Sequence, residues 1–149
     1  MAQTYFGSAL RSGSGTLTDT TDGGFVVLMQ TSTVTTNADG TASSTSVTIP
    51  SGSQIVNLFI DQTQNEVVGG GTATAINATV GTAAAGTQYV SATDVIGGGR
   101  AALTFTAAQL AAMADVGSNT SVFLTVDPNG TISTTQGIYR FTVVYAQKG

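Results

Sequence analysis

The segment DPNGTISTTQGIYRFTVVYAQKG (residues 127–149) decides the fold class of this chain. It opens with a Pro-Asn-Gly turn. It ends in a run where aromatic or branched apolar residues at every second position alternate with a set that includes Arg140. A period of two predicts a β-strand with two different faces. We expect one face to lie in a core and the other, with Arg140, to lie against a sheet rim or a neighbouring subunit. The core face carries Tyr139, Phe141, Val143 and Tyr145.

Upstream segments have the β-branched composition or the alternation of strands. They span residues 25–36, 45–50, 54–62, 72–82, 87–96 and 120–127. In three of these segments, apolar residues two positions apart are expected to lie on the same face of the strand. They are Val47 and Ile49; Ile76, Ala78 and Val80; and Val122, Leu124 and Val126. Pro50 is expected to end its strand. Asp39 and Gly40 form a dipeptide that is typical of hairpin turns, so we expect a turn there.

Residues 54–62 (QIVNLFIDQ) give the clearest buried strand. Strict alternation places Val56, Leu58 and Ile60 on one face. The opposite face then carries Ile55 and Phe59. Because both faces are apolar, this strand is predicted to be central in a sheet and covered on both sides.

One segment, TAAQLAAMADVG (residues 106–117), changes from a period of two to a helical pattern. Thr106 and Gln109 have the spacing of a capping box, and Gly117 is placed to end the helix. Leu110, Met113 and Ala114 would then share a face that we expect to pack on the core. The helix is predicted to cross between sheets or to cover an open end.

These elements predict an all-β fold, an antiparallel β-sandwich that is jelly-roll-like, with one short helix around residues 106–116. An up-and-down barrel is the alternative. Residues 1–24 are rich in Gly, Ser and Thr around isolated apolar residues, which predicts an extended N-terminal arm. Residues 25–149 are predicted to form a single β-sandwich domain.

Charge and composition exclude several kinds of partner. Only 8% of the residues are charged, and four basic residues stand in a chain of net charge −4. This balance cannot neutralise a track of phosphates, so direct binding to nucleic acid is not expected. The N-terminus lacks the pattern of a signal peptide, and no apolar run is long enough to span a membrane. We therefore expect synthesis in the cytoplasm and no membrane partner.

The residue inventory also argues against catalysis. The chain has no histidine and no cysteine, which removes the usual triads and histidine-ligated zinc sites. The remaining alternative is a carboxylate glycosidase, but the acidic residues are expected in turn or capping positions. They are Asp61, Glu66, Asp94, Asp115 and Asp127. The glycine clusters do not match a phosphate-binding loop, and Asp19 and Asp22 lack calcium-loop spacing. The sequence therefore predicts no catalytic residue, no cofactor and no metal site.

Contact with other proteins is the function class that remains. Apolar residues on an extended arm gain most by ordering on a partner, and arginines beside apolar residues need water, a carboxylate or a partner chain. A snorkelled surface position is the alternative for each arginine. The candidate residues for an interface with a partner protein or with another subunit are Tyr5, Phe6, Leu10, Arg11, Arg100 and Arg140.

Three stretches carry a resemblance to a known family: MAQTYFGSALRSGSGTLTDTTDGGF at the start, GTQYVSATDV in the middle and TVDPNG...STTQGIYRFTVVYAQ near the end. Together they look like the capsid decoration, or cement, proteins of tailed bacteriophages. The similarity is one of pattern over most of the chain and rests on no invariant motif.

The resemblance implies a structural virion protein on the outer capsid surface, made in the host cytoplasm without a signal peptide. It implies two partners: the major capsid protein, whose subunits the protein would bridge, and further copies of itself in a homotrimer. Two alternatives stay open. One is a phage tail or fibre-head subunit, and the other is a carbohydrate-binding β-sandwich module.

Overall fold

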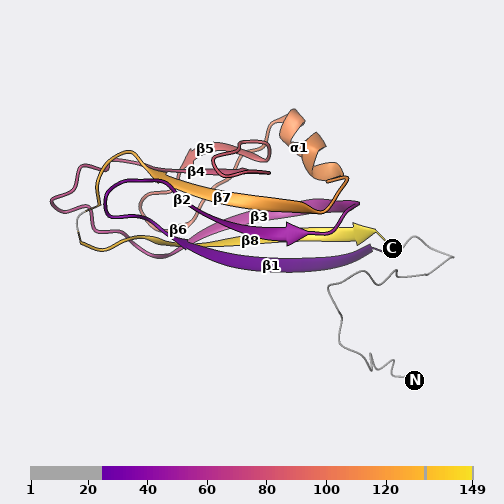
Figure 1. The fold of residues 1–149 in the computed structure, drawn as a ribbon, viewed down its shortest axis with the longest axis horizontal. Helices are drawn as coiled ribbons and strands as arrows, with labels where there is room; N and C mark the ends of the chain where they lie inside the picture. The colour runs from indigo at the N-terminus through magenta and orange to yellow at the C-terminus, as the bar shows by residue number, and fades with distance from the viewer. Residues whose placement is uncertain (1–24, 133, 149) are drawn as a thin grey trace, which may run out of the picture.

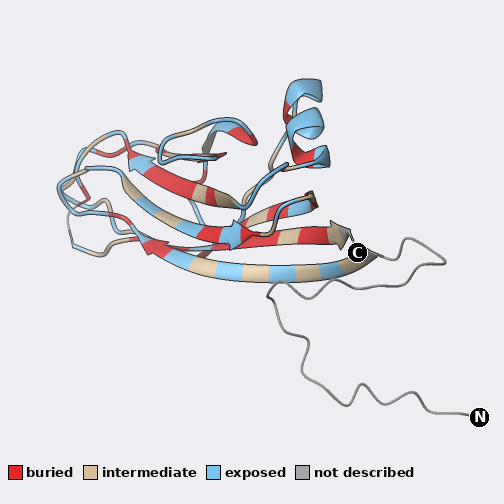
Figure 2. Ribbon diagram, turned by 45° about the vertical axis from the view of Figure 1, so that its right-hand side comes forward, coloured by how far each residue is buried: buried red, intermediate tan, exposed pale blue. Residues whose placement is uncertain are grey.

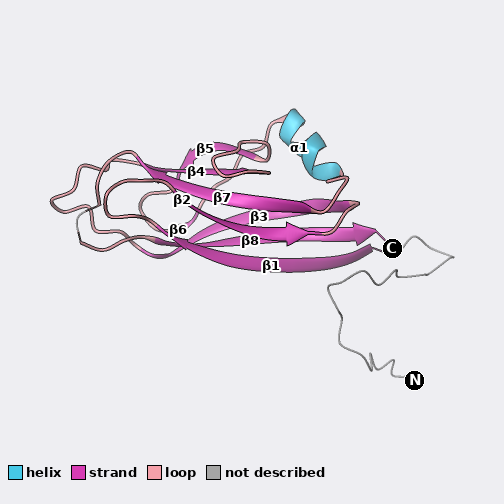
Figure 3. Cartoon of the chain, in the orientation of Figure 1, coloured by secondary structure: helices cyan, strands magenta, loops and turns pink. Residues whose placement is uncertain are grey.

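A computed structural model describes residues 25–132 and 134–148 of the chain (Figure 1). The predicted arm, residues 1–24, lies outside the described residues. Within the described part, eight β-strands form two four-stranded antiparallel sheets, and one short helix is the only helical element. Figure 3 shows this helix at one end of the layered strands. The all-β sandwich predicted from the sequence is therefore confirmed.

The two sheets are named here by their strand orders, 1-8-3-6 and 2-7-4-5. The 1-8-3-6 sheet contains β1 (Phe25–Thr35), β8 (Ile138–Lys148), β3 (Ser53–Gln64) and β6 (Gly99–Arg100). The 2-7-4-5 sheet contains β2 (Ser43–Ile49), β7 (Thr120–Pro128), β4 (Ile76–Gly81) and β5 (Val90–Asp94).

The strand pairing is that of a jelly roll. The first strand pairs with the last, the second with the seventh, and so on inward: β1 with β8, β2 with β7, β3 with β6 and β4 with β5, all antiparallel. The chain therefore forms one long antiparallel ribbon, open at the β1–β8 end and closed at the β4–β5 end. Pairing of β8 with β3 and of β7 with β4 rolls this ribbon into two sheets. At the open end of the ribbon, Phe25 pairs with Lys148. Because β1 and β2 belong to different sheets, the chain is not an up-and-down barrel.

The same topology shows that the turn at Asp39 and Gly40 does not join a hairpin, although its sequence is typical of one. It carries the chain from β1 in one sheet to β2 in the other. Gly40 has φ +83°, and a Cβ atom there would lie 2.6 Å from the carbonyl oxygen of Gly130. The turn therefore uses glycine because it packs closely against the loop that follows β7.

The core lies between the two sheets, where inward side chains alternate with outward ones. All four residues of the predicted core face of β8 are buried: Tyr139, Phe141, Val143 and Tyr145. The opposing sheet buries the apolar series of β4 and β7 that were predicted to be in phase: Ile76, Ala78, Val80, Val122, Leu124 and Val126. In Figure 2, β1 is mostly exposed or intermediate, because it is an edge strand of its sheet.

Strand β3 departs from the predicted alternation because it contains a bulge. The register against β8 shifts between Ile55 and Asn57, so the alternation restarts one residue later. Ile55 and Leu58 are therefore both buried, while Val56 is 52% exposed. The prediction that Val56 shares a buried face with Leu58 is wrong, and only one face of β3 lies in the core.

The helix α1 (Ala107–Ala114) connects β6 to β7 and so crosses from one sheet to the other, as predicted. Thr106 and Gln109 form both bonds of the predicted capping box. The predicted core face is wrong in part, because Met113 is buried but Leu110 and Ala114 are exposed. Gln109 takes the inward position instead, since its Nε2 donates to the Thr87 carbonyl oxygen and to the Ser91 hydroxyl.

Candidate functional site

The outer face of the 1-8-3-6 sheet carries side chains that point away from the core, and the strand register arranges them in rows. One row runs from Thr31 on β1 through Thr142 on β8 to Phe59 on β3. The neighbouring row ends in three charged residues that are direct cross-strand partners: Arg140 on β8, Asp61 on β3 and Arg100 on β6. Residues that are far apart in the chain are thus brought together by the sheet.

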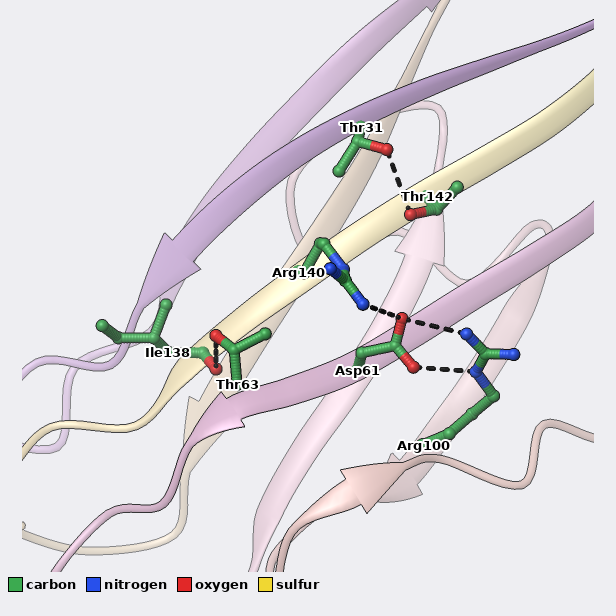
Figure 4. Close-up of polar contacts among 7 residues, drawn as sticks. All are labelled: Thr31, Asp61, Thr63, Arg100, Ile138, Arg140 and Thr142. Carbon is green, nitrogen blue, oxygen red and sulfur yellow. Dashed lines mark hydrogen bonds and ion pairs between the residues drawn. The ribbon is translucent and has the colours of Figure 1, made fainter.

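Asp61 bonds to both arginines (Figure 4). Arg100 donates from Nε to Oδ1 at 2.7 Å and from Nη2 to Oδ2 at 3.2 Å. Arg140 donates from Nη2 to Oδ2 at 3.2 Å. The side chain of Asp61 is only 13% exposed, whereas those of Arg100 and Arg140 are 58% and 49% exposed. The carboxylate is covered and the two guanidinium groups face outward.

The ion pairs bias the charge state of this cluster. The hydrogen bond from Arg100, and then that from Arg140, hold the pKa of Asp61 below its usual value despite an opposing effect of burial. The Asp61 carboxylate in turn raises the pKa of Arg100. Two positive charges against one negative charge leave the cluster with a net charge of about +1 at neutral pH. Arg100 and Arg140 are also the only basic side chains among those that the structure describes.

Arg100 is held by a second contact besides Asp61. Its guanidinium carbon lies 4.4 Å from the centre of the Phe59 ring, a distance that permits a cation–π interaction. Phe59 is partly buried, and this contact places the arginine over its ring. The orientation of Arg100 is therefore fixed from two sides without any partner molecule.

A shallow depression of about 400 Å³ lies between these side chains. Its lining consists of Met29, Thr31, Phe59, Asp61, Arg100, Arg140 and Thr142. The hydroxyl groups of Thr31 and Thr142 lie 3.2 Å apart and share a hydrogen bond, which joins β1 to β8 at the floor of the site (Figure 4). The depression thus combines cationic, hydroxyl and apolar groups on one face of the sheet.

Exposed apolar side chains extend from the depression along the same face. Val27 is 62% exposed, Met29 is 68% exposed, and Val56 projects from the bulge in β3. These are three of the five large apolar residues that are exposed in the described part of the chain; the others are Val67 and Leu110. We call Val27, Met29, Val56 and the Arg100–Asp61–Arg140 cluster, together, the outer patch. Exposed apolar side chains that gather on one face in this way can form part of an interaction site.

The structure brings together two of the six candidate interface residues and does not describe the other four, so the predicted interface role stays a prediction for all six. Arg100 and Arg140, predicted as interface residues, lie in one cluster, and each finds a carboxylate. Tyr5, Phe6, Leu10 and Arg11 lie outside the described residues. Met29, Val56 and Phe59 were not predicted as site residues. Alternation along residues 25–36 could have indicated Met29, but the exposure of Val56 depends on the bulge.

Two of the acidic residues accept hydrogen bonds from nearby backbone N–H groups, as expected of turn and capping positions, and a third requires a correction. Asp61 was expected in a turn or capping position, but it lies within β3 and pairs with two arginines. Asp94 accepts from the backbone N–H groups of Ile76 and Ile96. Asp115 accepts from Gly117 N at the end of α1.

Glu66 accepts hydrogen bonds from the Tyr139 hydroxyl, at 3.0 Å, and from Gln62 Nε2. Burial, and then the charge of Glu66, raise the pKa of Tyr139. This phenol therefore stays protonated and acts as a donor within the core.

Within residues 25–132 and 134–148, no three His, Cys, Asp or Glu side chains are placed to hold a metal ion together. In the same part of the chain, no helix has both the length and the apolar character needed to span a membrane. Comparisons with protein-family models, with curated proteins and with solved structures found no match.

Proposed function

We propose that this chain is a structural binding module that decorates the head of a tailed bacteriophage and stabilises its lattice by bridging major capsid subunits. The outer patch would be its contact with the capsid. The observation that carries the proposal is the exposure of Val27, Met29 and Val56 beside a pre-oriented pair of arginines on a rigid sheet. The virion setting comes from the sequence resemblance described above.

The composition of the outer patch supports protein binding. Met, Arg and aromatic residues are enriched in protein interfaces, whereas Lys, Glu and Asp are depleted. The outer patch contains Met29, Arg100 and Arg140, with Phe59 beneath one arginine, and its single acidic side chain, Asp61, is only 13% exposed. Burial of exposed apolar groups against a partner would supply the driving force.

The carbohydrate-binding alternative has less support in the described part of the chain. Sugar recognition by stacking requires the open face of an aromatic ring. Among the aromatic side chains whose burial is described, none is exposed, and the face of Phe59 is occupied by Arg100. A tail or fibre-head subunit would use the same kind of surface, so the choice between head and tail is left to the experiment.

The test is co-sedimentation with heads that lack the protein. The proposal requires that the genome encoding the chain also encode a major capsid protein, and heads assembled from that protein provide the test surface. We expect the wild-type protein to pellet with the heads, and Met29→Asp to weaken binding by about tenfold or more. Leu110→Asp is the matched control, because it adds the same charge at an exposed apolar position on α1.

Three outcomes would contradict the proposal or part of it. Equal binding of Met29→Asp and wild type would remove the outer patch from the interface. Binding to purified tails and not to heads would favour the tail alternative. Unchanged binding after deletion of residues 1–16 would remove the predicted role of the arm. Light scattering tests the predicted homotrimer separately, and a monomeric mass would contradict it.

A further inference from the structure

We infer that the depression between Arg100 and Arg140 recognises a carboxylate side chain of a partner protein, with an apolar neighbour of that carboxylate lying on Met29. This inference rests on the proposed role of the outer patch as a protein-binding surface. It adds the chemistry of the group that is recognised: an Asp or Glu next to an apolar residue in an exposed segment.

The guanidinium groups retain unused donors. An arginine side chain has five N–H bonds arranged in a fork. Arg100 gives two of them to Asp61, and Arg140 gives one. Among the described residues, Asp61 is the only acceptor that either guanidinium group reaches. The remaining donors lie on side chains that are about half exposed, so they can reach a second carboxylate from outside the sheet.

The charge of the cluster favours an anionic group. Asp61 satisfies one of the two guanidinium charges, and the net charge of about +1 remains at the surface. The whole chain carries a net charge of −4, so this cluster is a local positive site on a protein that otherwise repels anions. One carboxylate would neutralise the cluster, whereas a dense array of phosphates would meet no further basic side chain among the described residues.

The arginines are oriented before a partner arrives. Arg100 is fixed by two hydrogen bonds to Asp61 and by its contact with Phe59. Arg140 is tied to the same carboxylate from the neighbouring strand. Binding would therefore lose little side-chain entropy, which is a frequent cost of recruiting long flexible residues to an interface.

The surroundings of the cluster favour a protein over a glycan as the source of the carboxylate. The depression of about 400 Å³ is large enough for one or two side chains, and Met29 forms part of its wall. Val27 continues the apolar surface beyond Met29 along β1. A hydrophilic uronic acid would leave these groups uncovered, whereas a peptide segment with an apolar residue beside its carboxylate would cover them.

The first experiment uses two blocked tripeptides, acetyl-Leu-Asp-Leu-amide and acetyl-Leu-Asn-Leu-amide, which differ only in the carboxylate. Nuclear magnetic resonance follows the arginine Nε–H signals and the Met29 methyl signal of the full chain during titration. We expect the acidic peptide to shift these signals in a saturable way. The amide peptide should bind at least about tenfold more weakly. Equal shifts with both peptides, or no shifts at these residues, would overturn the inference.

Substitutions test whether Arg140 itself is responsible for binding the acidic peptide. Arg140→Gln is expected to weaken binding of the acidic peptide about tenfold, and Arg140→Lys to restore part of it, since lysine keeps the charge but loses the fork. Ser46→Glu is the matched control, because it changes the net charge by the same amount on the other sheet. Equal losses in Ser46→Glu and Arg140→Gln would reduce the effect to overall charge and overturn the inference.

Three further outcomes test this inference separately from the proposed function. Tighter binding of glucuronate than of the acidic peptide would overturn the choice of a protein partner in favour of a glycan. On heads, loss of binding by Met29→Asp with full binding by Arg140→Gln would keep the proposed interface and overturn the carboxylate inference. If the protein binds the acidic peptide but does not bind heads, the inference on ligand chemistry stands. The capsid is then excluded as the source of the carboxylate.

Discussion

The two sheets of the sandwich differ in what they present to the outside. The outer face of the 2-7-4-5 sheet bears hydroxyl groups that bond to one another, such as Ser44 with Thr125 at 2.8 Å and Thr48 with Ser121 at 3.1 Å. Ala85 N, from the loop between β4 and β5, donates to Thr125 Oγ1 at 2.7 Å. The outer face of the 1-8-3-6 sheet instead carries the exposed apolar and cationic groups of the outer patch.

The two outer faces differ in how far the chain itself covers them. The loop between β4 and β5 packs so closely on the 2-7-4-5 sheet that a Cβ atom at Gly81 would lie 2.5 Å from the backbone carbon of Gly86. That face is partly closed by the chain itself. The outer patch has apolar groups in water and spare guanidinium donors, both of which gain by contact with a partner. The proposed binding face is therefore the one that the fold leaves open.

The largest expected effect separates the core from the outer patch within one strand. Phe141→Ala removes a fully buried ring from β8 and is expected to lower the free energy of unfolding by about 3–5 kcal/mol. Arg140→Ala, at the adjacent outward position, is expected to cost about 1 kcal/mol or less, because its ion pair is half exposed. Urea denaturation measures both. Similar losses in the two variants would contradict the assignment of opposite roles to the two faces.

A smaller effect tests the closed face. Gly81→Val would place side-chain atoms where the loop between β4 and β5 now lies, and overpacking of this kind costs about 1–3 kcal/mol. We expect lower stability by urea denaturation and faster hydrogen exchange at Ala85 N, whose bond to Thr125 would be lost. Binding to heads by the opposite sheet should be unchanged in protein that remains folded. A loss of binding with normal exchange at Ala85 would mean that the closed face also contacts the partner.

The smallest effect concerns Asp61 and depends on pH. Asp61 has a pKa that is lowered in the folded state, so its ionisation stabilises the fold above the unfolded value and stops doing so as pH falls through the folded value. Asp61→Asn is therefore expected to cost about 1 kcal/mol or less at pH 7, and the difference from wild type should shrink below about pH 4. Urea denaturation at several pH values measures it. A difference that stays constant from neutral to acidic pH would contradict the role of the charge.

The sequence predicts the local part of this fold well. The alternation in residues 138–145 gives the inward and outward faces of β8 because each strand residue takes a side by simple geometry. The capping box at Thr106 is equally local. The errors arise where a partner elsewhere in the chain decides the outcome. Val56 is exposed because the register with β8 shifts beside it, and Leu110 is exposed because Gln109 finds acceptors at Thr87 and Ser91.

The candidate site shows the same division. Composition singled out Arg100 and Arg140, since charged residues beside apolar ones are rare in this chain. Their shared partner could not be identified, because Asp61 is 39 positions from Arg100 and 79 positions from Arg140. Only the jelly-roll pairing of β8, β3 and β6 brings the three together. Met29 and Val56 became candidates for the same reason, once the outer face of one sheet was known.

The pairing of Phe25 with Lys148 has a practical consequence for labelling the protein. Any segment attached before Phe25 and any fusion placed after Lys148 leave the sandwich from the same end of the 1-8-3-6 sheet. Thr33, the β1 partner of Arg140, lies eight residues further along the strand, about 26 Å away. A fluorophore or affinity tag at the C-terminus would therefore lie at the end of the sheet where β1 begins, and it would leave the arginines accessible.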